Sequence, residues 1–213
     1  MADRYALVVD ATNNNIKEIP AADRLVADNL LLSGTTPTLT IGDAGAEDTK
    51  IVFDGNAQDF YIGLDDSADD LVIGLGSAVG TTPAISIDEN QVAKFEAAIT
   101  EQATSLTSGT TVALDVRDGG VFEITLGHNI GTFNWSNHAL SGAVSSFIMK
   151  VVQDGTGNRT IAWPDGTNSV TVRWPGDTAP TLSSGAADVD IFVFFTHDGG
   201  TNYYGFTAGL DLL

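Results

Sequence analysis

Cysteine is absent from this chain of 213 residues. Neither a disulfide framework nor a thiolate metal site can form, so stability has to come from packing and association. Basic residues are scarce as well: 9 lysines and arginines stand against 28 aspartates and glutamates, a formal net charge of -19. Because such a charge repels phosphate backbones, we expect no nucleic-acid partner.

Long apolar runs are also missing. No stretch of 18 consecutive apolar residues occurs, and Asp3 and Arg4 precede the first short apolar run. These features predict no signal peptide and no membrane insertion. The length allows one large or two small domains, which suffices to bury a core.

Motifs for catalysis are weak. The glycines of residues 74–80 follow an apolar strand, but the third is one residue late for a dinucleotide loop, and Pro83 interrupts the helix that should follow. No Gly-x-Ser-x-Gly motif occurs, and the histidines at 128, 138 and 197 lack the spacing of zinc ligands. We therefore predict a protein that is not an enzyme and that needs no cofactor.

An acidic cluster is the one candidate for a metal. Asp65, Asp66, Asp69 and Asp70 could offer oxygen ligands to calcium, but the central glycine and the bidentate glutamate of an EF-hand loop are missing. A solvated turn is the commoner role for such a cluster, and the sequence predicts no metal site.

What the sequence does contain is an 11-residue repeat between residues 38 and 90. Ile51, Ile62 and Ile73 are 11 residues apart, and so are Phe53, Leu64 and Leu75. The offset of two residues within each pair puts both side chains on one face of a strand. Phe60 and Leu71 extend this face, and a looser fourth copy contains Ile85 and Ile87.

Each copy predicts one strand of about five residues and a turn, too small to bury its own apolar face. Stacked copies from three intertwined chains would cover that face, as in β-structured fibre shafts. The predicted subunit interface then consists of Ile51, Phe53, Ile62, Leu64, Ile73 and Leu75. The alternative is a β-meander or sandwich within one chain, whose strands are commonly spaced by 8 to 12 residues.

The stretch after the repeat has two competing patterns. Val92, Phe95, Ile99 and Leu106 fit a heptad, whereas residues 99–107 are rich in β-branched residues with period two. We expect a short helix at most, followed by a strand, as a neck over residues 91–109.

Short strands dominate the remainder. Eight are predicted, at residues 111–116, 121–126, 133–135, 146–153, 159–163, 170–174, 190–196 and 203–207. Gly-rich links at residues 154–158 and 197–202 predict hairpins. The segment 190–195 is apolar on both faces and should be a central strand. This pattern predicts a β-sandwich or jelly-roll-like domain.

The first residues predict a hairpin or an extended arm. Residues 5–10 and 16–20 are strand-like and flank a turn at residues 13–15. Residues 21–32 fit a helical turn as well as a strand.

Two groups of residues resemble surface proteins of tailed-bacteriophage virions. One is the opening Leu7-Val8-Val9-Asp10, continued by Asn15 to Asp23 and by Asn29-Leu30. The other is a C-terminal pattern that recurs in small β domains of such proteins: Gln153 to Thr160, Trp163-Pro164, Trp174-Pro175-Gly176, Ala179 to Leu182, Asp188 to Phe195 and Tyr203 to Phe206.

The resemblance implies a homotrimeric protein on the virion surface, made in the cytoplasm of the bacterial host. It implies an all-β chain with an N-terminal attachment arm (1–37) that contacts other virion proteins, a β-repeat shaft (38–90) and an exposed C-terminal β domain (91–213). Because no long shaft follows the arm, a short fibre, an appendage or a capsid-decorating (cement) protein is expected.

An adhesin at a tail-fibre tip is the alternative function, with a host surface glycan as partner. Flat aromatic side chains could stack on sugar rings, and the candidates are Trp135, Trp174, Tyr203 and Tyr204. Packing of turns and core edges is the commoner role of such residues. A polysaccharide depolymerase, which needs only two suitably spaced carboxylates, is a more remote alternative.

Overall fold

The computed structural model describes residues 7–10, 15–18 and 28–212, and this part of the chain is nearly all β-structure. The predicted all-β class is confirmed. The chain divides into two compact units, residues 1–97 and residues 98–213. Among the described residues, no helix has the length and apolar character needed to cross a membrane.

The first described element is a two-stranded hairpin. Strand β1 (Leu7–Asp10) pairs antiparallel with β2 (Asn15–Glu18), and Leu7 stands opposite Glu18. Of the two arrangements predicted here, a hairpin or an extended arm, the hairpin is present. Most of the segment 21–32, which was open between helix and strand, lies outside the described residues.

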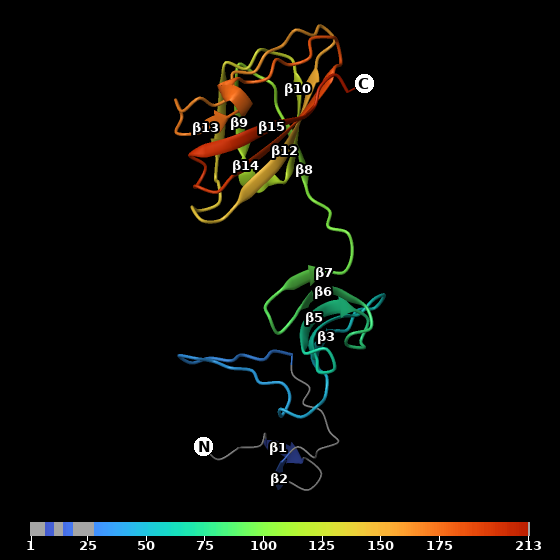
Figure 1. The fold of residues 1–213 in the computed structure, drawn as a ribbon. Helices are drawn as coiled ribbons and strands as arrows, with labels where there is room; N and C mark the ends of the chain where they lie inside the picture. Colours follow the sequence, from blue (N-terminus) through green and yellow to red (C-terminus); the bar gives the residue numbers. More distant parts are fainter. Residues whose placement is uncertain (1–6, 11–14, 19–27, 213) are drawn as a thin grey trace. The chain divides into compact units, whose positions relative to one another are not determined.

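Residues 28–48 form a long connection without helix or strand, and all of them are exposed (Figure 1). The segment includes Leu30, Leu31, Leu32, Leu39 and Ile41 among the large exposed apolar side chains.

The 11-residue repeat forms a five-stranded antiparallel sheet. Its strands follow chain order: β3 (Thr49–Phe53), β4 (Phe60–Asp65), β5 (Asp70–Leu75), β6 (Pro83–Ile87) and β7 (Ala93–Phe95). Each repeat supplies one strand and the turn that reverses the chain. Within the single chain, the repeat thus forms a β-meander, which was the alternative to stacked copies from three intertwined chains.

The segment 91–109, for which a short helix at most and then a strand were expected, contains two short strands and no helix. Residues 93–95 pair with β6 as β7, and residues 103–106 form β8 in the second unit. The first unit therefore extends to Ala97, beyond the expected boundary at residue 90. The apolar residues Val92, Phe95 and Ile99 are exposed and form no heptad seam.

The second unit is built around a six-stranded sheet in the order β13-β15-β14-β12-β10-β8. Its further strands are β10 (Val121–Leu126), β12 (Ser145–Gln153), β13 (Thr171–Arg173), β14 (Val189–Thr196) and β15 (Asn202–Gly209). A second sheet pairs β9 (Thr111–Asp115) with β11 (Thr132–Ser136). Short 3-10 helices occur at Val116–Asp118 and Pro175–Asp177.

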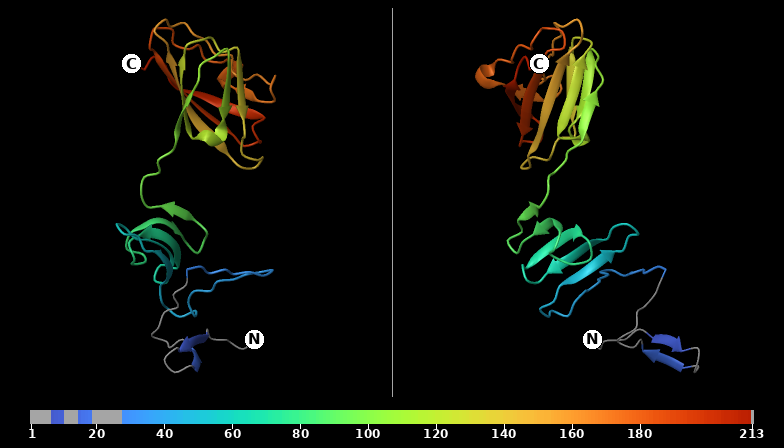
Figure 2. Two further views of the ribbon diagram at one scale, coloured as in Figure 1. Left: turned by 180° about the vertical axis from the view of Figure 1, so that it is seen from behind. Right: turned by 90° about the vertical axis from the view of Figure 1, so that its right-hand side faces the viewer.

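The chain from β8 to β12 alternates between these two sheets. Strand β10 is parallel to both β8 and β12, and β9 is parallel to β11. Successive strands therefore coil between two layers, which Figure 2 shows in two views. In the same sheet, β14 pairs antiparallel with both β12 and β15.

A hydrophobic core fills the space between the layers. It is rich in aromatic rings packed edge to face, such as Trp135 against Phe194 at a centroid distance of 5.0 Å. Strand β14 lies between β15 and β12, as predicted for residues 190–195. One of its faces is fully buried, whereas the other face is only half-buried.

The two predicted hairpins have opposite outcomes. Residues 197–202 do connect the antiparallel strands β14 and β15, and the Asp198 carboxylate accepts hydrogen bonds from the backbone and side-chain nitrogens of Asn202 at 3.0 and 2.8 Å. The hairpin at residues 154–158 is wrong, since β12 pairs with β10 and β14 instead. The strand predicted at 159–163 is reduced to one bridge between Ile161 and Ile130.

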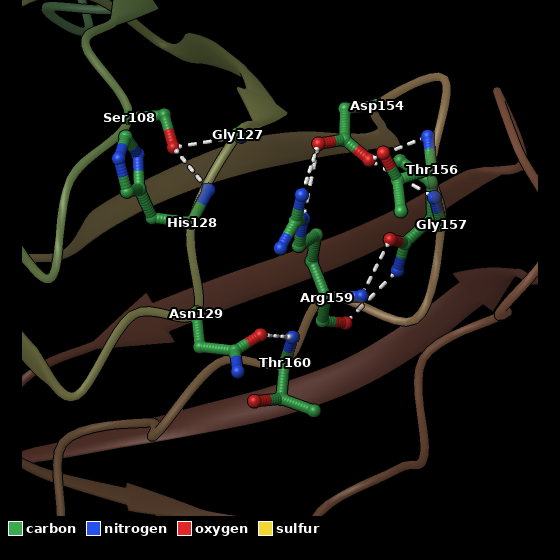
Figure 3. Close-up of polar contacts among 10 residues, drawn as sticks. Ser108, Gly127, His128, Asn129, Asp154, Thr156, Gly157, Arg159 and Thr160 are labelled. Carbon is green, nitrogen blue, oxygen red and sulfur yellow. Dashed lines mark hydrogen bonds and ion pairs between the residues drawn. The ribbon is translucent and has the colours of Figure 1, made fainter.

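Local hydrogen bonds explain this second outcome (Figure 3). The Asp154 carboxylate accepts the amide protons of Thr156 and Gly157, each at 2.9 Å, and forms an ion pair with Arg159 at 2.7 Å. The side-chain amide of Gln153 accepts from the Arg159 nitrogen and donates to the Arg159 carbonyl. Side chains thus satisfy the backbone groups that a hairpin ladder would use.

Candidate functional site

The most conspicuous surface of the first unit is one face of the meander, which we call the apolar face. It carries eleven large apolar side chains: Ile51, Phe53, Phe60, Ile62, Leu64, Leu71, Ile73, Leu75, Ile85, Ile87 and Phe95. All six residues predicted at a subunit interface lie on this face. Apart from the half-buried Ile85, the exposed fractions run from 37% for Ile87 to 55% for Phe53.

The register of the strands aligns these side chains in rows across the sheet. The central row contains Ile51, Ile62, Ile73, Ile85 and Phe95. Shorter rows flank it on both sides, Phe53-Phe60-Leu75 and Leu64-Leu71-Ile87. Directly opposed side chains on one face of an antiparallel sheet are close neighbours, so each row forms a continuous apolar strip. Phe95 was assigned to the neck from the sequence, because its spacing from Val92 also fits a heptad.

The opposite face of the meander is covered by the chain itself. Residues 76–82, the covering loop, connect β5 to β6 and lie over Tyr61, which is fully buried. The Gly80 backbone nitrogen donates to the Tyr61 hydroxyl at 3.1 Å, and Lys50 Nζ donates to the Ser77 carbonyl. The loop therefore covers the central part of this face, around Tyr61, whereas the described residues leave the apolar face exposed.

Two glycines, 11 residues apart, permit this close cover. A Cβ on Gly74 would lie 2.5 Å from Cζ of Tyr61 and 2.7 Å from the Thr82 carbonyl oxygen. A Cβ on Gly63 would lie 2.6 Å from the Thr49 carbonyl oxygen on β3 and 3.3 Å from Cγ2 of Val79 in the loop. The repeats Ile62-Gly63-Leu64 and Ile73-Gly74-Leu75 thus put bulk on the apolar face and leave room for the loop on the other.

Three of the four candidate glycan contacts do not reach the surface. Trp135, Trp174 and Tyr203 are 5%, 8% and 0% exposed and belong to the core of the second unit. The Tyr203 hydroxyl is hydrogen-bonded to Nδ1 of His138 at 2.7 Å, and burial raises the pKa of this tyrosine. Burial also lowers the pKa of His138. These residues therefore stabilise the fold and form no platform for sugars.

Tyr204 is the one candidate that is exposed, and its ring is engaged by its neighbours. It stacks on Phe195 at 5.2 Å and on His197 at 6.2 Å, while Phe195 stacks on Phe206 at 6.1 Å. Since the rings cover one another, their inner faces are closed to a ligand.

The acidic cluster is a turn between β4 and β5. The Asp65 carboxylate accepts hydrogen bonds from Ser67 Oγ at 2.7 Å and from the Ala68 nitrogen at 3.3 Å. Among residues 7–10, 15–18 and 28–212, no three acidic or histidine side chains are grouped in a way that could hold a metal ion.

Comparisons with models of protein families, with curated proteins and with solved structures found no match. Function has to be inferred from the surfaces of the molecule. The apolar face carries a single polar side chain among its paired residues, Thr49 opposite Leu64, and an apolar patch of this extent is typical of a surface that another protein covers.

Proposed function

We propose that this protein is a structural component of a bacteriophage virion: a homotrimeric short fibre, appendage or capsid-decorating protein on the particle surface. The observation that carries the proposal is the apolar face, which one chain leaves open to water. The resemblance of residues 7–30 and 153–206 to tailed-phage surface proteins supports the virion setting and the choice of three chains.

The expected energy of association is large. Burying one Leu, Ile or Phe side chain contributes about 1.5–3 kcal/mol, and about half of each is already covered in the single chain. Eleven such residues then contribute roughly 10 kcal/mol per chain, or about 30 kcal/mol for three chains. This exceeds or matches the cost of two association steps, about 4–15 kcal/mol each.

Each part of the chain has a role in this assembly. Three apolar faces close on one another and form the core of the repeat region. Residues 1–37 attach the trimer to other virion proteins. The C-terminal unit is the sandwich or jelly-roll-like domain displayed on the particle, and its acidic charge keeps the assembly soluble.

Light scattering coupled to size-exclusion chromatography tests the association. At about ten micromolar we expect three times the chain mass of 22.2 kDa. Ile51 and Val52 provide a matched pair, because they are neighbours on β3, are 43% and 37% exposed, and point to opposite faces. Ile51→Asp should dissociate the trimer and Val52→Asp should not. A wild-type monomer or dimer would contradict the proposal.

Antibody labelling of phage particles tests the virion setting. Antibodies raised against residues 98–213 should decorate heads or tails in electron micrographs of particles from cells that express the gene. Absence of the protein from purified, intact particles would count against a virion role even if the trimer forms.

A further inference from the structure

A second exposed apolar element precedes the meander. Residues 29–42, which we call the leucine segment, expose Leu30, Leu31, Leu32, Leu39 and Ile41 to water. Leu31 is 84% exposed, close to the most that a leucine can be. Five such side chains on one short stretch form an apolar surface that a single chain leaves uncovered.

The leucine segment also lacks the backbone pairing that holds an ordered chain. It contains no helix or strand, and no backbone hydrogen bond ties it to other described residues. Connections of this length without structure of their own are uncommon in compact units. Residues 38–41, Thr-Leu-Thr-Ile, nevertheless alternate with the period of a strand.

Charge distinguishes this segment from the rest of the chain. No charged residue occurs between Asp28 and Asp43, although 17% of the chain is charged. In a protein with a net charge of -19, a second copy repels any acidic segment that approaches it. A neutral, leucine-rich segment avoids this repulsion, so its composition suits a surface on another copy.

The C-terminal end of the leucine segment lies at the border of the apolar face, and the segment is long enough to extend beyond the sheet. Ile41 lines a shallow apolar hollow together with Ile51, Ile62, Leu64 and Leu71. Fourteen extended residues span roughly 45–50 Å, whereas five strands are about 19 Å wide. Apart from this contact of Ile41, the leucines of the segment remain exposed in the single chain, and so does most of the apolar face.

We propose that the leucine segment of one chain packs on the apolar face of a second copy, so that neighbouring chains exchange their segments. The inference rests on the proposed self-association and specifies which surfaces meet. Each copy then contributes leucines that cover part of a neighbour's sheet, and the chains become linked as well as stacked.

Cross-linking between chains tests the exchange directly, because the natural chain has no cysteine to interfere. Chains with Leu31→Cys are mixed and refolded with chains of different mass that carry Ile62→Cys, Ile73→Cys or Phe95→Cys, and a short bismaleimide is added. We expect covalent pairs of unequal chains. The matched control replaces Leu31→Cys by Leu140→Cys, an 85% exposed leucine of the second unit, and should give few pairs.

Aspartate substitutions provide a second measurement. Leu31→Asp should raise the concentration of half-dissociation at least tenfold, whereas Leu140→Asp should leave it unchanged. A trimer in which Leu31→Cys links to none of the three positions overturns the exchange and leaves the proposed trimer standing. A wild-type chain that is monomeric by light scattering overturns the proposed function itself.

Discussion

The two units of this chain differ in how far they bury their apolar residues. The C-terminal unit buries seventeen hydrophobic side chains in one cluster between two layers. In the described part of the N-terminal unit, only Tyr61 and Val72 are buried hydrophobic residues, while ten of the eleven side chains on the apolar face are exposed. A two-layer unit provides its own core, whereas the described part of the N-terminal unit is a single sheet covered by one loop and leaves one apolar face exposed.

The difference predicts different kinds of stability. The C-terminal unit should fold and unfold as an independent domain, because its core is complete within one chain. The meander should depend on association, and so on protein concentration. All three tryptophans, at 135, 163 and 174, lie in the C-terminal unit, so their fluorescence reports on that unit alone.

The largest effect is expected from Phe194→Ala, which removes a fully buried ring at the centre of the C-terminal core. The ring contacts Trp135 and Phe147 at centroid distances of 5.0 and 5.1 Å. The free energy of unfolding should fall by about 3–5 kcal/mol in urea titrations followed by tryptophan fluorescence. Phe195→Ala, on the half-buried face of the same strand, is the control and should cost about 1–2 kcal/mol. Equal losses would mean that the core is not where the strand register puts it.

The next largest effect is expected from Gly74→Ala in the meander. The added Cβ would meet the Tyr61 ring and the Thr82 carbonyl, so the covering loop has to move. We expect a loss of about 2–3 kcal/mol in the N-terminal unit, measured by far-ultraviolet circular dichroism, with unchanged tryptophan fluorescence. Gly45→Ala is the control, because its Cβ meets mainly the flexible end of Glu47. A shift in the tryptophan transition would show that the two units are not independent.

Dilution should separate the two units without any substitution. For a trimer, a hundredfold dilution removes about 2 kcal/mol of stability per chain from the part that folds with association. The circular dichroism transition of the meander should therefore move to lower temperature, while the fluorescence transition stays in place. If neither transition temperature depends on protein concentration, the stability of the meander does not depend on association.

The sequence predicted the apolar face well and the C-terminal topology poorly, for physical reasons. An antiparallel meander preserves the alternation of side chains, so Ile51, Ile62 and Ile73 share a face whichever way the strands pair. Parallel pairing of β8, β10 and β12 joins strands that are not consecutive, and no local residue pattern encodes it. The tight turn at Asp198 could be recognised from its residues. The turn at Asp154 has similar residues but connects no hairpin, because the Asp154 carboxylate is bound to the Arg159 side chain.

Burial of the aromatic residues was the other point that sequence could not decide. Tryptophan and tyrosine are found both in cores and at binding sites, and their position on a strand determines which. Tyr203 and Tyr204 are adjacent on β15 and therefore point to opposite faces of the sheet, one into the core and one outward. Which of the two tyrosines faces the core depends on the strand register, and the register is known only from the structure.

The smallest effect concerns acid stability of the C-terminal unit. Hydrogen bonds from the side chain and backbone of Asn202 hold the pKa of Asp198 at about 2, below the ordinary value near 3.9. A carboxylate with a lowered pKa stabilises the fold above the pKa of the unfolded chain, and this contribution is lost as pH falls from about 4 to about 2. Asp198→Asn should therefore lower stability at pH 6, leave it nearly unchanged at pH 2, and flatten the fluorescence-detected profile between these values.

His138 belongs to the same unit but affects its stability at higher pH than Asp198 does. Because burial lowers its pKa, the unfolded chain takes up the proton first, and stability falls as pH drops below about 6.5. Asp198→Asn leaves that part of the profile intact, and Asp177→Asn, at another exposed aspartate of this unit, is the control for loss of a charge. If the profile below pH 4 keeps its slope in Asp198→Asn, the turn at β14–β15 does not set the acid limit. Since the fluorescence reports on the C-terminal unit alone, that limit would then lie in another carboxylate of this unit, such as Asp154, whose pKa is lowered by its hydrogen bonds to Arg159.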